Sequence, residues 1–263
     1  MKRYWIAGLI LCAVAFSGQA IGFKAPLIVP GVPFKIEPLG YTVDPVNTQV
    51  TAVLFSDHVR FTGLPDGCTV SGSGATCPGV KDLAFTAVAD DTLNGGSVRI
   101  MVYSLLNGVP EGEAAINPVN VYLTFFVTDT GDSLGGAIDL ANHNCHSDRA
   151  CMVAFRLGTP PESGYFTIKP KHALPKITAE TVSIDGRTQT GLTGDTNPDG
   201  PEVFIDGTDS ASEDGLVVSA PCAVDIAGLA IGNFRNAAVT MNGDDHPNPI
   251  VCDQLPADYT RSV

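Results

Sequence analysis

Three related pentapeptides decide the fold: Val182-Ser-Ile-Asp-Gly186, Val203-Phe-Ile-Asp-Gly207 and Val224-Asp-Ile-Ala-Gly228. Each places β-branched residues before or beside a corner glycine, and the motifs start at two equal offsets of 21 residues. A period of this length is typical of solenoids, in which equivalent side chains of successive coils stack on one another. The repeat therefore predicts an internal ladder of Ile184, Ile205 and Ile226.

A second, weaker repeat supports more than one strand in each coil. The segments LVVS, from Leu216, and AVTM, from Ala238, are offset by 22 residues. Stacked coils of this kind make parallel sheets. The alternative is that the repeated segments are strands of unrelated hairpins.

The first half of the chain has a different pattern. From Phe23 to about Val127, short apolar segments alternate with breaks of Gly, Pro, Asn and Asp. Strands at this spacing are typical of an antiparallel sandwich. We therefore predict an immunoglobulin-like β-sandwich over residues 21–126, followed by the solenoid over residues 127–263.

The stretch GLPDGCTVSGSGATC is predicted to be a hairpin, since its Gly/Ser tip tolerates positive φ and a Cys68–Cys77 disulfide would fix its register. It also resembles the bacterial conserved-repeat domains of cell-surface proteins. The matching residues are Leu64, Pro65, Gly67, Cys68, Thr76 and Cys77.

One amphipathic helix is predicted between the two halves. Its apolar positions recur at i, i+3, i+4 and i+7: Leu134, Ala137, Ile138 and Ala141. Either Asp132 or Ser133 is available as the N-cap.

From this helix onward, the chain resembles bacterial right-handed parallel β-helix repeat proteins that begin with a Cys-Ser-Leu-Arg-Glu-Ala type cap region. The first matching group is Thr130, Asp132, Ser133, Leu134, Ala137, Ile138, Ala141 and Asn142. The second is Ala173, Leu174, Pro175, Ile177, Val182, Ile184, Asp185, Gly186, Thr188, Gln189 and Gly191. Gly135 departs from the pattern, which usually has Arg there. The resemblance implies an all-β chain with one capping α-helix and about three coils of a short right-handed parallel β-helix.

The N-terminus indicates export. Lys2 and Arg3 precede an apolar run and the small residues of Gly18-Gln19-Ala20, which predicts a signal peptide over residues 1–20. No later segment is apolar over the length of a transmembrane helix. The formal net charge of −13, with no cluster of Lys or Arg, argues against a nucleic-acid partner. We expect a secreted protein, in the periplasm, outside the cell or on the outer cell surface.

Signal cleavage would leave six cysteines in an oxidising compartment. Sequential pairing is the simplest arrangement: Cys68–Cys77, Cys145–Cys151 and Cys222–Cys252. A zinc site is the alternative for the cluster of His143, Cys145, His146 and Cys151, but it lacks paired Cys-x-x-Cys spacing.

Two carboxylates are candidate catalytic residues. Carboxylates on a β-helix face can act as general acid and base on glycans, which draws attention to Asp185, Asp206 and the nearby Asp225. The competing interpretation is that Asp-Gly forms an ordinary tight turn. The sequence also suggests no Arg or Lys beside them on the neighbouring strands.

No cofactor is expected, with calcium as the one candidate. Asp195, Asn197 and Asp199 fit the first half of a calcium loop, and Asp206 falls at its twelfth position. Pro198 within the loop, and Asp in place of Glu, favour a plain solvated turn.

The leading functional prediction is a non-catalytic secreted or cell-surface protein that serves adhesion by binding a glycan or a surface protein. One alternative is a polysaccharide-active hydrolase or lyase working on the coil faces. Another is a truncated fragment of a longer adhesin.

Overall fold

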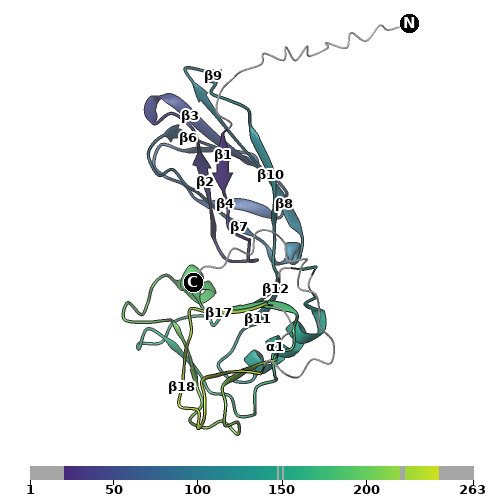
Figure 1. Cartoon of the computed structure of the whole chain (residues 1–263). Helices are drawn as coiled ribbons and strands as arrows, with labels where there is room; N and C mark the ends of the chain where they lie inside the picture. Colours follow the sequence, from purple (N-terminus) through teal and green to yellow (C-terminus); the bar gives the residue numbers. More distant parts are fainter. Residues whose placement is uncertain (1–20, 147, 150, 220–222, 243–263) are drawn as a thin grey trace, which may run out of the picture.

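The structure is a computed structural model that describes residues 21–146, 148–149, 151–219 and 223–242. This part of the chain is mostly β, with several sheets and two α-helices. Antiparallel sheets form one end and parallel sheets the other (Figure 1). The predicted leader lies outside the described residues, and none of the described helices has the length and hydropathy of a membrane span.

The antiparallel part contains two sheets around one core. The first has the order β1-β2-β7-β4, and the second has the order β10-β8-β3-β6-β5 with β9 paired to β8. Their bounds are β1 Gly22–Lys24, β2 Phe34–Leu39, β3 Asp44–Phe55, β4 Val59–Gly63, β5 Thr69–Ser71, β6 Gly74–Gly79, β7 Phe85–Ala89, β8 Ser97–Leu106, β9 Val109–Pro110 and β10 Ala115–Asn120. Alternate side chains, such as Phe34 and Ile36 of β2, point into the core because successive residues of a strand face opposite sides.

The predicted hairpin is present in this part. Strands β5 and β6 pair antiparallel, with Thr69 opposite Thr76 and Val70 opposite Ala75. The Cys68–Cys77 disulfide closes the hairpin at its base.

The parallel part contains three sheets, with the orders β11-β12-β14-β17, β13-β15-β18 and β16-β19. Their bounds are β11 Leu123–Val127, β12 Cys151–Phe155, β13 Phe166–Ile168, β14 Thr181–Asp185, β15 Val203–Asp206, β16 Leu216–Val218, β17 Ala223–Ala227, β18 Ala230–Gly232 and β19 Val239–Met241. The chain visits the sheets in a fixed cycle: β14, β15 and β16, then β17, β18 and β19. Strand β11 pairs with β12, although the sequence prediction assigned its first four residues, 123–126, to the sandwich.

The predicted 21-residue coil is wrong. Ile184 stacks in register with Ile226, but Ile205 lies in another sheet, where it pairs with Ile168 and Ile231. One circuit from Ser183 to its neighbour Asp225 takes 42 residues. The motif recurs at half that distance because strands in two different sheets end at similar corners.

Glycine is required at these corners mainly because there is no room for a Cβ atom. Gly228 has a φ of +62°, but Gly186 has an ordinary φ of −66°. A Cβ atom on Gly186 would lie 2.0 Å from the carbonyl oxygen of Gly228 on the next circuit, and one on Gly207 would meet the ring of Phe234 at 2.5 Å. Close approach of neighbouring circuits therefore excludes larger residues here.

Helix α1, Ser133–Asn144, is the predicted amphipathic helix, and the four predicted apolar residues are the ones it buries. At its far end, the Asn142 side chain accepts hydrogen bonds from the backbone of Thr178 and Ala179. Cys145 and Cys151 form a disulfide, so their sulfur atoms do not form the alternative zinc site. The third predicted pair, Cys222–Cys252, lies outside the described residues.

Backbone and side-chain interactions connect the antiparallel and parallel parts. Ile28 forms a parallel bridge with Val121, donating to the carbonyl of Asn120 and accepting from the amide of Tyr122. Arg156, which follows β12, makes two hydrogen bonds of 2.9 and 3.0 Å to Asp91 in the antiparallel part. Its guanidinium also lies over the ring of Phe126 at 3.7 Å.

Candidate binding groove

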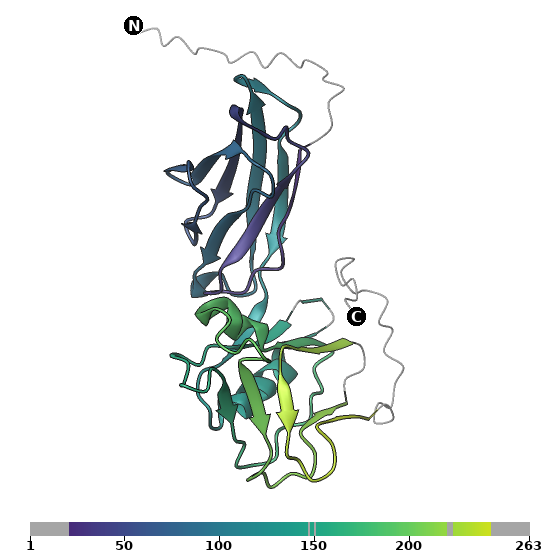
Figure 2. The same cartoon turned by 90° about the vertical axis from the view of Figure 1, so that its left-hand side faces the viewer.

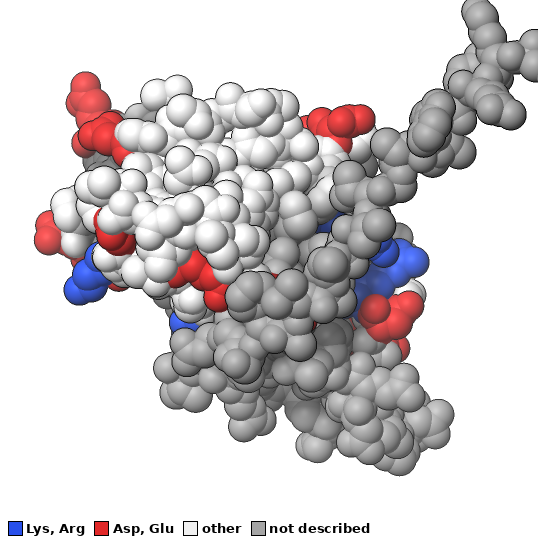
Figure 3. Space-filling model, turned by 90° about the horizontal axis from the view of Figure 1, so that it is seen from above, with Lys and Arg blue, Asp and Glu red and all other residues white. Residues whose placement is uncertain are grey.

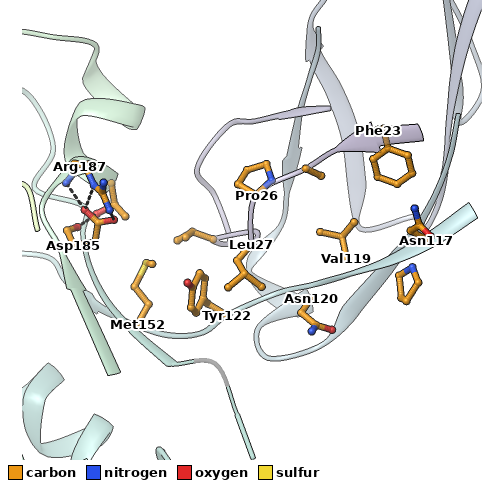
Figure 4. A pocket seen from close by; sticks show the side chains of 14 residues that line it. Phe23, Pro26, Leu27, Asn117, Val119, Asn120, Tyr122, Met152, Asp185 and Arg187 are labelled. Atoms are coloured by element: carbon orange, nitrogen blue, oxygen red, sulfur yellow. Dashed lines mark hydrogen bonds and ion pairs between the residues drawn. The ribbon is translucent and has the colours of Figure 1, made fainter. Parts of the chain in front are cut away.

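A pocket of about 640 Å³ lies at the junction of the two parts. Met152, Asp185, Arg187 and Thr188 line it from the parallel side. From the antiparallel side it is lined by Phe23, Ala25, Pro26, Leu27, Val29, Asn117, Pro118, Val119, Asn120 and Tyr122. Figure 4 shows the charged pair at one end of this junction groove and Phe23 with Asn117 at the other. Its walls come from segments that are far apart in the sequence.

The charged end of the groove is a bidentate ion pair between Arg187 and Asp185. Nε and Nη2 of Arg187 donate to the two carboxylate oxygens of Asp185 at 2.9 and 2.8 Å. These hydrogen bonds from the guanidinium to Asp185 raise the pKa of Arg187 above its ordinary value. The Asp185 side chain is 11% exposed and that of Arg187 is 62% exposed. Asp185 therefore fixes the position of a guanidinium that still presents donors to solvent.

Helix α2, Arg187–Thr193, sets this geometry and was not predicted. Its first residue is Arg187, whose backbone amide also donates to Asp185. Thr188 and Gln189 are buried and accept hydrogen bonds from the backbone of Phe155 and Leu157 on the neighbouring circuit. The helix is thereby anchored to the parallel sheets, and Arg187 is anchored with it.

The rest of the groove combines apolar side chains with amide and hydroxyl groups, and it lies beside two sheet edges. Strands β1 and β10 are edge strands of their sheets. The apolar part of the wall is formed by Pro26, Leu27 and Val119, and Tyr122 lies nearby (Figure 4). Pro118 of β10 has no N–H to donate, which makes this edge a poor template for an added strand.

The lining of the groove has no net charge. Asp185 and Arg187 are its two ionised side chains and they pair with each other. The other polar groups are the amides of Asn117 and Asn120 and the hydroxyls of Tyr122 and Thr188. In the end-on view of Figure 3, the surface that the grey residues leave visible is mostly uncharged, with acidic side chains at its margin and basic side chains beside some of them.

The two candidate catalytic carboxylates do not share a sheet. Asp185 ends β14 and Asp206 ends β15, and these strands belong to different sheets. The prediction that the neighbouring strands carry no Arg or Lys beside them missed partners just outside the strands: Asp185 pairs with Arg187 of α2, and Asp206 lies 3.5 Å from Lys169. Lys169 directly follows β13, the neighbour of β15, so sequence distance concealed the contact.

Asp206 is a structural link between circuits. Its carboxylate accepts from the hydroxyl of Thr208 at 2.6 Å, the amide of Thr208 at 3.0 Å and the side chain of Asn233 at 2.8 Å. The hydrogen bond from the Thr208 hydroxyl, followed by that from Asn233, lowers the pKa of Asp206 to about 2. The residue is 7% exposed, so these partners replace water around its charge.

This environment predicts acid sensitivity. The folded pKa lies below the ordinary value of 3.8, so the stabilisation from Asp206 is complete above pH 4 and is lost as the pH falls toward 2. Asp206→Asn should weaken the dependence of the free energy of unfolding on pH in this window. Urea denaturation at several pH values measures it, with the exposed Asp57→Asn as control. An unchanged pH dependence in Asp206→Asn would contradict the assignment.

The calcium hypothesis gains no support. Asp195 and Asp199 are at least partly exposed, Asn197 donates to the carbonyl of Pro201, and the Asp206 carboxylate is engaged by Thr208 and Asn233. In the described ranges, no group of three or more His, Cys, Asp or Glu side chains is arranged to hold a metal ion.

Comparison with known proteins adds little. No family model matches the chain, and no curated protein matches it. A solved structure to which it is similar is a DUF4466 family protein from Parabacteroides merdae ATCC 43184, with 10% sequence identity and a TM-score of 0.24. The match covers 40% of this chain and 46% of that one, which is under half of either length. A likeness this slight says nothing about function.

Proposed function

We propose that the chain is a secreted or cell-surface, non-catalytic binding protein whose junction groove binds a neutral glycan. In this proposal, an immunoglobulin-like sandwich is followed by a short right-handed parallel β-helix with α1 as its cap. The cyclic passage of the chain through three parallel sheets supports the β-helix. The sequence resemblance to Cys-Ser-Leu-Arg-Glu-Ala type β-helix proteins points the same way.

Export is supported by sequence and cysteine chemistry together. The predicted leader at residues 1–20 would direct the chain out of the cytoplasm. The disulfides Cys68–Cys77 and Cys145–Cys151 persist in oxidising compartments and are rare elsewhere.

The observation that carries the binding proposal is the neutral groove with its fixed guanidinium. Sugar hydroxyls both donate and accept hydrogen bonds, so they match a site that offers a guanidinium, a carboxylate and two amides. The less polar faces of sugar rings pack against apolar and aromatic side chains, here Leu27, Val119 and Tyr122. An anionic glycan is disfavoured because Asp185 already neutralises Arg187.

A hydrolase or lyase is the weaker alternative. Glycoside hydrolysis by general acid–base catalysis needs two carboxyl groups that flank one bond. Asp185 and Asp206 end strands of separate sheets, and each is held by partners of its own. This arrangement favours structural roles for both.

Isothermal titration with neutral and acidic oligosaccharides tests the proposal. Neutral ligands should bind and acidic ones should bind more weakly. Arg187→Ala should weaken binding about 10-fold or more, since hydrogen bonds to charged groups contribute about 1.5–3 kcal/mol. Asn120→Ala, in the opposite wall, should weaken it less. The exposed Arg235, outside the groove, provides the control Arg235→Ala, which should bind normally.

Two results would reject the proposal. If no neutral oligosaccharide gave a heat of binding, the glycan-binding proposal would be rejected. If Arg187→Ala and the parent protein bound a glycan with equal affinity, the groove would be rejected as the binding site. Circular dichroism of each variant checks that Asp185, left without its partner, has not disturbed the fold.

A further inference from the structure

The sequence contains three Asn-Gly pairs, and one of them forms the tip of the hairpin that joins β8 to β9. Strand β8 ends at Leu106 and β9 begins at its paired neighbour Val109, so Asn107 and Gly108 make up the whole turn. Both have positive φ, of 52° and 78°, as a two-residue type I′ turn requires. The tip lies at the end of the antiparallel part opposite the parallel part (Figure 1 and Figure 2).

An Asn-Gly pair places a nucleophile beside an amide. The backbone nitrogen of the glycine can attack the side-chain carbonyl carbon of the asparagine before it. A new C–N bond forms, the bond to the side-chain nitrogen breaks, and that nitrogen leaves as ammonia with the proton of the attacking N–H. Water then opens the cyclic imide at either carbonyl, which leaves aspartate or isoaspartate. Glycine favours the attack because it has no Cβ atom to obstruct the approach and its backbone rotates freely.

The two reacting groups at this tip are unrestrained. Asn107 and Gly108 are both exposed, and a Cβ atom added to Gly108 would have no atom within 4 Å. Among the described residues, neither the Asn107 side chain nor the Gly108 amide has a hydrogen-bond partner. The backbone amide of Asn107, which takes no part in the reaction, donates to the carbonyl of Asn47 at 2.8 Å.

Asn94-Gly95 has the same sequence in a different environment. It is also exposed, so accessibility does not distinguish the two pairs. The Asn94 side chain donates to the carbonyl of Thr124 at 3.1 Å and accepts from the amide of Thr124 at 2.6 Å. The amide of Gly95 donates to the carbonyl of Tyr122 at 3.1 Å. Attack at Asn94 therefore requires that these hydrogen bonds open first. The third pair, Asn242-Gly243, reaches beyond the described residues.

We propose that the β8–β9 tip is a site of spontaneous covalent modification, at which Asn107 converts to aspartate and isoaspartate. Each event adds a negative charge. Isoaspartate also inserts a methylene group into the main chain, which then no longer matches the type I′ turn. The amide of Glu111, which donates to the carbonyl of Ser104 at 3.2 Å just beyond the tip, should lose protection as the hairpin loosens. The junction groove plays no part in this proposal.

Incubation of the folded full chain in mildly alkaline buffer, followed by peptide mass spectrometry, tests the proposal. Asn107 should convert at least about 10-fold faster than Asn94, because only Asn94 must first break hydrogen bonds. In the urea-unfolded chain the two residues should convert at similar rates, since both precede glycine. Hydrogen exchange at the amide of Glu111 should be faster in the converted fraction than in the intact one.

A substitution in the turn separates the local chemistry from the rest of the fold. In Gly108→Ala the added methyl group obstructs the attack, so conversion of Asn107 should slow about 10-fold or more while that of Asn94 stays the same. The matched control is Gly72→Ala at the tip of the β5–β6 hairpin. Gly72 also has positive φ, of 58°, and open space around an added Cβ atom, and this variant should leave the rate at Asn107 unchanged.

Three results would overturn the proposal. The first is an Asn107 that stays intact in the folded chain while it converts in the unfolded one. The second is conversion of Asn94 as fast as that of Asn107 in the folded chain. The third is an unchanged rate at Asn107 in Gly108→Ala.

Discussion

Replacing Gly186 with alanine should lower the free energy of unfolding of the parallel part by about 3 kcal/mol, the upper range for overpacking a rigid site. The added Cβ would lie 2.0 Å from the carbonyl oxygen of Gly228 and 2.7 Å from a methyl group of Leu229. A backbone oxygen cannot move aside unless β17 moves with it. Urea denaturation followed by circular dichroism measures the loss.

A glycine elsewhere gives the matched control. At Gly136, in α1, an added Cβ would have no atom within 4 Å, so Gly136→Ala should be neutral or stabilise by up to about 1 kcal/mol. Since the φ of Gly186 suits any residue, backbone strain contributes nothing to the contrast. Equal effects of the two substitutions would show that the circuits do not approach as closely as described.

Ile184→Ala should cost about 4 kcal/mol, within the range for emptying a fully buried site. Ile184 is 0% exposed and lies between Val153 and Ile226 on neighbouring strands. Neither neighbour can fill the space, because each is fixed in register by its own strand. Thermal and urea denaturation would show the change.

The control for this substitution is Leu140→Ala on the exposed side of α1, where the leucine is 54% exposed and a change within about 0.5 kcal/mol is expected. A small cost at Ile184 would mean that the stacked side chains of Val153, Ile184 and Ile226 do not carry the stability of the parallel part. The antiparallel part has a separate hydrophobic core, so the midpoint of its unfolding transition should be unchanged in both variants.

Much of the local structure followed from local sequence. The buried face of α1 was predicted residue by residue, because a 3.6-residue period fixes which side chains share a face. The Cys68–Cys77 hairpin was predicted because a Gly/Ser tip between two short strands permits few other conformations.

The candidate site was predicted only in part. Asp185 was singled out, but as a catalytic residue. Its partner Arg187 was overlooked, although it stands two positions later in Asp185-Gly-Arg187. The opposite wall, with Leu27 and Asn120, could not be found, since nothing in the sequence connects those residues to an Asp-Gly corner more than sixty positions away.

By itself, the sequence determined where strands and corners occur, because chain stiffness, side-chain period and glycine act over a few residues. Which strands become neighbours was decided by the tertiary structure. Ile184 and Ile205 occupy equivalent places in their motifs, yet they belong to different sheets, since the circuit from β14 to β17 is 42 residues long, twice the motif spacing. Packing and hydrogen bonding between distant segments settle that choice, and the junction groove exists only as its result.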